Sequence, residues 1–71
     1  MTKQELSKNG YTESHGIFQK KICIGNVLRV IVISETPDGY CREESFYKKG
    51  DELPFDIVPA VYNKNLKELV I

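Results

Sequence analysis

The ten residues from Val27 to Thr36, VLRVIVISET, constrain the fold more than any other part of this chain. Aliphatic and β-branched side chains dominate the segment, which predicts a β-strand. Alternate residues point to opposite faces, which gives one face with Leu28, Val30 and Val32 and another with Ile31 and Ile33. Both faces are apolar, as is typical of a central strand covered on both sides. We therefore expect an aspartate at Val30 or Val32 to bury an unpaired charge and unfold the domain.

Turn signals on either side of this segment predict its two neighbours in the sheet. Residues 17–24, IFQKKICI, precede the pair Gly25-Asn26, which is typical of a tight hairpin turn. On the other side, Thr36-Pro37-Asp38-Gly39 predicts a type I turn with a glycine bulge. The chain then returns antiparallel over residues 40–47. The expected centre of the fold is a three-stranded antiparallel meander over residues 17–47.

The register of the first hairpin has two alternatives. A two-residue loop places Ile22 opposite Arg29, whereas a three-residue loop places it opposite Val30. The second alternative is favoured because it gathers apolar side chains on one face.

The strand over residues 40–47 mixes aromatic and charged side chains. Tyr40, Arg42, Glu44 and Phe46 share one face, and Cys41, Glu43, Ser45 and Tyr47 share the other. Charges on both faces favour an edge strand with a solvated face, a composition that also discourages pairing with other chains.

The two ends of the chain are expected to add less regular structure. Residues 2–10 predict a short helix, with Thr2 and Glu5 at capping-box spacing and Asn9-Gly10 as a stop. Residues 12–16 are expected to form a polar connector. Residues 52–61 are expected to be irregular or weakly extended, because Pro54 and Pro59 exclude them from a central strand. Residues 66–71, LKELVI, are interpreted as a last strand in preference to a helical turn.

Together these features predict one small domain over residues 1–71, an α+β fold that is mostly β. It would combine the meander of residues 17–47, one or two C-terminal strands and the short N-terminal helix. The sequence leaves open whether residues 52–71 close a small barrel or cover an open sheet. A chain of 71 residues buries only about 60% of the surface of its unfolded form, which disfavours a deep, preorganised active site. We therefore expect no enzymatic activity.

Charge and cysteine content narrow the class of protein further. Ten basic residues balance ten acidic ones, so no global field attracts nucleic acid or an anionic membrane. The two cysteines, Cys23 and Cys41, are too few for a disulfide scaffold and are expected to be free thiols on strands that flank the central one. No apolar segment is long enough for a signal peptide or a membrane span. A bacterial or phage protein of the cytoplasm is expected.

Residue patterns that could carry catalysis or bind metal are absent from the sequence. His15, Cys23 and Cys41 lack the close spacing of zinc ligands and the third group of a nucleophilic triad. Glu43 and Glu44 would point to opposite faces of one strand. The glycines are scattered at turns and form no phosphate-binding loop. We expect no catalytic residue, no metal and no cofactor.

The candidate binding residues are Tyr40, Arg42, Tyr47, Lys48 and Lys49, all on one hairpin arm. Tyrosine and arginine are the residues that most often anchor protein interfaces. The sequence therefore favours a small non-enzymatic protein-binding domain, which acts stoichiometrically as an accessory, regulator or inhibitor of a larger protein. A homodimer through an edge strand would fit the same features. The alternative is a small β-barrel that binds nucleic acid by stacking bases on these aromatic side chains.

Overall fold

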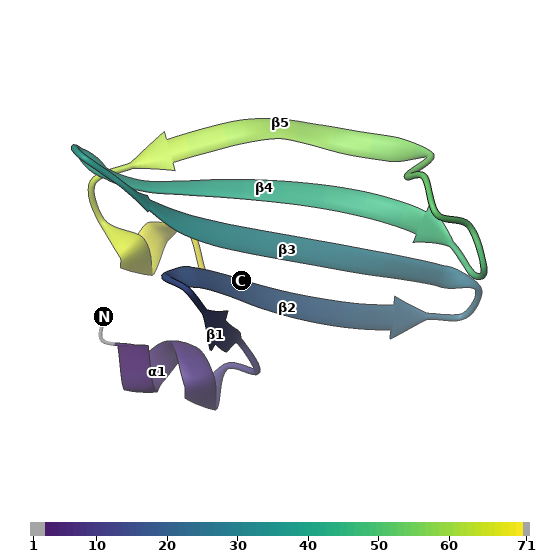
Figure 1. The fold of residues 1–71 in the computed structure, drawn as a ribbon, viewed down its shortest axis with the longest axis horizontal. Coiled ribbons are helices and arrows are strands. Elements are labelled where there is room, and N and C mark those ends of the chain that lie inside the picture. Colours follow the sequence, from purple (N-terminus) through teal and green to yellow (C-terminus); the bar gives the residue numbers. More distant parts are fainter. Residues whose placement is uncertain (1–2, 71) are drawn as a thin grey trace.

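A computed structural model describes residues 3–70 of the chain. A short helix, α1 (Lys3–Lys8), precedes a five-stranded antiparallel sheet, and a 3₁₀ turn, η1 (Leu66–Glu68), follows it (Figure 1). The strands are β1 (Thr12–Ser14), β2 (Ile17–Ile24), β3 (Val27–Thr36), β4 (Gly39–Lys48) and β5 (Asp56–Asn63). They lie in the sheet in the order in which they follow in the chain. The expected mostly-β α+β fold is confirmed, and the sheet is an open meander, not a barrel.

β3 occupies the predicted central position, but its register with β2 differs from the favoured alternative. Ile22 lies opposite Arg29, and Gly25-Asn26 forms a two-residue loop between Ile24 and Val27. This register places Phe18 opposite Ile33, and both side chains are buried. Arg29 does not prevent this arrangement because Glu44 on β4 pairs with its guanidinium. The three-residue loop was the wrong choice because the sequence did not reveal this partner.

β4 is not the edge strand that its charges indicated, because it pairs with β3 on one side and with β5 on the other. Its charged residues Arg42 and Glu44 face the core and have partners there. β5 forms the edge instead. Its pairing with β4 shifts register between Arg42 and Glu44, the level at which Pro59 lies. The exclusion of residues 52–61 from a central position is therefore confirmed, but residues 56–63 form a regular strand where an irregular or weakly extended segment was expected.

The turn between β3 and β4 lies where it was predicted. The two strands stay in register from Val27 and Lys48 to Thr36 and Gly39, so the expected glycine bulge is absent. A Cβ atom added to Gly39 would lie 2.7 Å from the carbonyl oxygen of Asn63. Glycine is needed at this position because the end of β5 approaches the backbone of the turn so closely.

The expected polar connector at residues 12–16 is a short strand and a turn. His15 and Gly16 both have positive φ, 52° and 78°, as a two-residue type I′ hairpin requires, and this turn pairs β1 with β2. The helix is confirmed from Lys3 onward, whereas Thr2 and its capping role lie outside the described residues. Within residues 3–70, no helix is long and apolar enough to span a membrane.

The C-terminal segment forms η1, so the expected last strand is wrong. Leu66 and Leu69 are both buried, and a helical turn brings two residues at this spacing to one side. In a strand they would point to opposite faces. The side chain of Asn65 caps the turn, since its oxygen accepts a hydrogen bond from the backbone N–H of Lys67 at 3.2 Å.

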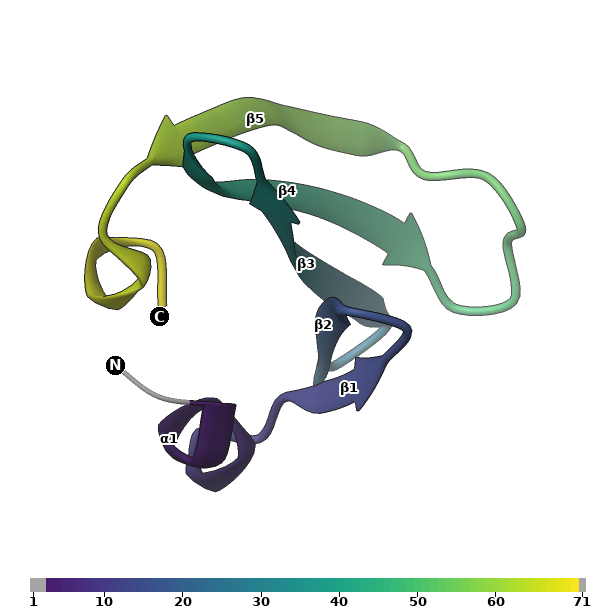
Figure 2. The same ribbon diagram turned by 60° about the vertical axis from the view of Figure 1, so that its left-hand side comes forward.

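The core lies on one face of the sheet only. Figure 2 shows α1 and η1 on the same side of the curved sheet. The buried cluster joins both ends of the chain to β2 and β3 and consists of Leu6, Tyr11, Phe18, Ile31, Ile33, Leu66 and Leu69. The expectation that β3 is covered on both sides is therefore wrong, because the residues described here cover the face of Ile31 and Ile33 and leave the other face open.

Candidate binding face

The face of the sheet opposite the core is here called the outer face. The strand register assigns to it Ile17, Gln19, Lys21, Cys23, Leu28, Val30, Val32, Ser34, Cys41, Glu43, Ser45, Tyr47, Ile57 and Tyr62. Alternate residues of β2, β3 and β4 contribute most of these side chains, and Ile57 and Tyr62 on β5 lie on either side of its register shift. The outer face is therefore a regular consequence of the meander.

The outer face carries more apolar side chains than the solvated face of a sheet usually does. Leu28, Val30 and Val32 form its half-buried centre along β3. Ile57 and Tyr62 on β5 are 63% and 70% exposed. A sheet with one solvated face usually carries polar side chains there. Apolar side chains gathered on one face of a small protein mark an interaction site more often than single exposed ones do, so the outer face is the main candidate for binding.

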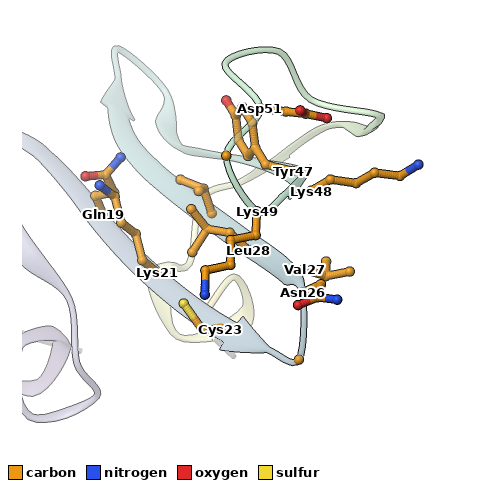
Figure 3. Close-up of a pocket in the computed structure, with 13 residues that line it drawn as sticks. Gln19, Lys21, Cys23, Asn26, Val27, Leu28, Tyr47, Lys48, Lys49 and Asp51 are labelled. Atoms are coloured by element: carbon orange, nitrogen blue, oxygen red, sulfur yellow. The ribbon is translucent and has the colours of Figure 1, made fainter.

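A groove of about 480 Å³ crosses one end of the outer face. Figure 3 shows Gln19, Lys21 and Cys23 along β2 on one side, Tyr47 and Asp51 on the other, and Leu28 between them. The β2–β3 turn and the segment that follows β4 complete the lining with Gly25, Asn26, Val27, Val30, Lys48, Lys49 and Gly50. The groove thus has an apolar floor, formed mainly by β3, and polar walls.

The rim of this groove is basic. Lys21, Lys48 and Lys49 are exposed, and Asp51 is the acidic residue among those that line the groove. At neutral pH the lining therefore carries an excess of positive charge, although the whole chain is neutral. An anionic group on a ligand would be favoured beside the apolar floor.

The five candidate residues predicted from the sequence divide between two places. Tyr47, Lys48 and Lys49 meet in the groove, Tyr47 from the outer face and the two lysines from the end of β4 and the loop that follows. Tyr40 and Arg42 point to the core face. Tyr40 packs against the buried cluster. The structure thus brings three of the five together, and their role in binding stays a prediction.

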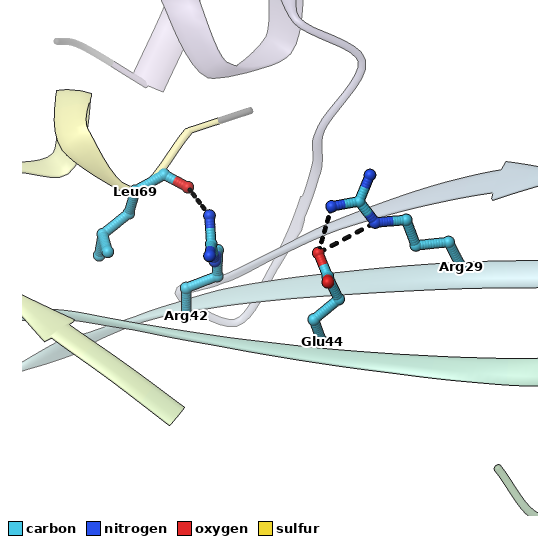
Figure 4. A network of polar contacts seen from close by, with 4 residues as sticks. All are labelled: Arg29, Arg42, Glu44 and Leu69. Atoms are coloured by element: carbon cyan, nitrogen blue, oxygen red, sulfur yellow. Dashed lines mark hydrogen bonds and ion pairs between the residues drawn. The ribbon is translucent and has the colours of Figure 1, made fainter. Parts of the chain in front are cut away.

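Arg42 supports the fold at the C-terminal end of the chain. Its Nη1 donates a hydrogen bond to the carbonyl oxygen of Leu69 at 3.1 Å (Figure 4). This contact ties the buried Leu69, the residue that directly follows η1, to the middle of β4. A half-buried arginine in such a role is not available to a partner.

A second polar contact lies on the core face beyond the buried cluster. The Nε and Nη2 atoms of Arg29 donate to the Oε1 atom of Glu44 at 3.0 and 2.5 Å (Figure 4). The guanidinium also lies over the ring of Phe46, 5.9 Å from its centroid. Phe46 in turn contacts Phe55 of the loop before β5. Arg42 and Glu44, two of the charged side chains of β4 that suggested a solvated edge, thus face the core, whereas Glu43 is exposed on the outer face.

The two cysteines occupy different environments on the outer face. Cys23 is exposed in the groove, whereas Cys41 is buried, and both are free thiols. Cys41 lies opposite Tyr62 across β4 and β5. Its electrostatic interaction with the phenol and a hydrogen bond between the two side chains raise the pKa of Tyr62 above the usual 10.0. Within residues 3–70, no group of His, Cys, Asp and Glu side chains is arranged to hold a metal ion.

Thiol labelling should distinguish the two cysteines in the native protein. Cys23 is expected to react with a maleimide at the rate of an exposed thiol, and Cys41 at least ~10-fold more slowly, because it reacts only when β4 and β5 open. Mass spectrometry of quenched samples, with a denatured sample as control, measures both rates. Equal rates in the native protein would contradict the burial of Cys41.

Sequence reasoning missed Lys21, Cys23, Leu28 and Val30 as groove residues. Alternation along residues 17–24 groups Lys21 with Cys23, and alternation along residues 27–36 groups Leu28 with Val30. The favoured three-residue loop placed the two pairs on opposite faces of the sheet, whereas the two-residue loop of the structure places them on the same face. The expectation that a second layer covers Leu28 and Val30 also argued against a groove there.

No protein-family model, curated protein or solved structure matches this chain.

Proposed function

We propose that this protein is a small non-enzymatic protein-binding domain, which docks on a larger protein through its outer face and acts stoichiometrically as an accessory, regulator or inhibitor. The observation that carries this proposal is the uncovered apolar centre of the sheet at Leu28, Val30 and Val32. Sheets in stable domains bury their apolar faces against a second layer. A partner protein would supply that layer here.

Other features support a protein partner over the alternative of nucleic acid. The aromatic and basic side chains of β4 do not form one continuous strip, since Arg42 and Phe46 face the core and Tyr47 faces outward. Stacking of successive bases needs such a strip. The exposed edge of β5 offers a further, smaller surface at which a second copy could pair, although Pro59 lacks a backbone N–H for such pairing.

The cytoplasm of a bacterial or phage-infected cell is the proposed compartment. Both thiols are free, which suits a reducing environment.

Affinity capture with matched variants tests the proposed function. Leu28→Lys places a charge in the middle of the outer face, and Leu53→Lys makes the same change in a loop where the leucine is already 80% exposed. Wild type and Leu53→Lys are expected to retain one specific protein from the producing cells, and Leu28→Lys to retain at least ~10-fold less, because buried interface centres exclude charge. Circular dichroism confirms that each bait is folded.

Capture that is the same with all three baits would contradict docking through the outer face. Capture that disappears after nuclease treatment would favour nucleic acid instead.

A further inference from the structure

We propose that the groove on the outer face takes a segment of the partner in which apolar side chains are flanked by aspartate or glutamate. This inference rests on the proposed function and specifies the chemistry of the partner. It follows from the apolar floor of the groove, from its basic rim, and from the repulsion between two such rims in a symmetric dimer.

The floor of the groove selects apolar side chains. Leu28 and Val30 lie side by side on one face of β3, and Tyr47 lies directly opposite Leu28 on β4. All three are half-buried, so each keeps apolar surface that a ligand can cover. The volume of about 480 Å³ is enough for a few side chains of a peptide.

The rim of the groove selects negative charge. Lys21 projects from β2 on one side, and Lys49 follows β4 near the other. Asp51 is the acidic residue of the lining, so the rim remains basic overall. Carboxylates on either side of the bound apolar side chains would meet both lysines, and such pairs at an interface rim set specificity and association rate.

The symmetry of a dimer argues against a second copy as the occupant. In a two-fold dimer the same patch of both subunits meets itself. A dimer centred on the groove would therefore bring the basic rim of Lys21, Lys48 and Lys49 against an identical basic rim. Like charges placed together oppose association, so a partner of opposite charge fits better.

Selection from a displayed library of random 12-residue peptides tests the proposal. Three baits are used: the wild type, the double variant Lys21→Glu with Lys49→Glu, and a control, Lys64→Glu with Lys67→Glu. The control makes the same change in net charge at two exposed lysines outside the groove. Wild type and control are expected to enrich peptides in which apolar residues are flanked by Asp or Glu, whereas the groove variant is expected to enrich flanking Lys or Arg.

Binding of the best acidic peptide then gives the size of the effect. Fluorescence anisotropy is expected to show at least ~10-fold weaker binding to the groove variant and less than ~2-fold change for the control, since charge reversal replaces attraction by repulsion. Binding should weaken with added salt. The peptide should also slow maleimide labelling of Cys23, which lies in the groove.

The outcomes separate this inference from the proposed function. No enrichment with wild type, enrichment without acidic residues, or equal binding by the two double variants would overturn the acidic segment. If Leu28→Lys still abolished capture of a protein partner, the proposed function would stand without it. Self-association of the wild type in sedimentation experiments, lost in Leu28→Lys, would assign the face to a second copy and overturn the proposal.

Discussion

Ile31→Lys is expected to unfold the protein, whereas Val30→Lys, one residue earlier on the same strand, is expected to leave it folded. Ile31 is fully buried between the sheet and the two terminal segments. A lysine there would bury an ammonium group beside Glu44, whose carboxylate is already paired with Arg29, and would lose the packing of the isoleucine, a cost of more than about 3 kcal/mol. A domain of this size has only about 3–5 kcal/mol of net stability, so this loss is enough to unfold it.

Val30 differs because its side chain lies on the outer face, which residues 3–70 leave uncovered. A lysine at this position can extend its ammonium group into water, so we expect a loss of only about 1–2 kcal/mol in the free energy of unfolding. Urea denaturation followed by circular dichroism measures both variants. This result would reverse the expectation from the sequence that charge at Val30 unfolds the domain. If Val30→Lys unfolded and Ile31→Lys did not, the two faces of β3 would have been assigned the wrong way round.

Removing Arg29 while Glu44 remains is expected to destabilise the protein by about 2–3 kcal/mol. The Glu44 side chain is only 8% exposed and has Arg29 as its ion-pair partner. Arg29→Leu would leave a nearly buried carboxylate without that partner, and breaking a buried pair costs several kcal/mol. The expected loss is smaller than for a fully buried ion pair because the Arg29 side chain is 25% exposed. Water can therefore reach the site and partly solvate the carboxylate of Glu44 when Arg29 is removed.

The double variant Arg29→Leu with Glu44→Leu supplies the comparison. Replacing both members of a buried ion pair by apolar residues is often neutral or stabilising, so its stability should lie within about 1 kcal/mol of wild type. Glu43→Leu, at the exposed neighbouring position on β4, is the control and should change stability by no more than about 0.5 kcal/mol. Urea denaturation of Arg29→Leu, Glu44→Leu and the double variant measures the three losses in stability. If the losses of the two single variants add up to the loss of the double variant, Arg29 and Glu44 do not interact in the folded protein.

The sequence by itself determined the local elements of this protein. The apolar run at residues 27–36 identified the central strand, and the turns at Gly25-Asn26 and Pro37-Asp38 placed its two neighbours. These features are set by residues close together in the chain, whose conformational preferences act without the rest of the fold. For the same reason, the alternation of side chains on β4 was read correctly.

Only the tertiary structure decided which surfaces are covered. Charges on β4 indicated an edge strand, but Arg42 and Glu44 have partners distant in sequence, the Leu69 carbonyl and Arg29. Likewise, Leu66 and Leu69 favoured a helical turn because the core lies on one side of them. The sequence shows that both faces of β3 are apolar, but not how many layers the chain can provide. The two short terminal segments cover one face, and residues 3–70 leave the other uncovered.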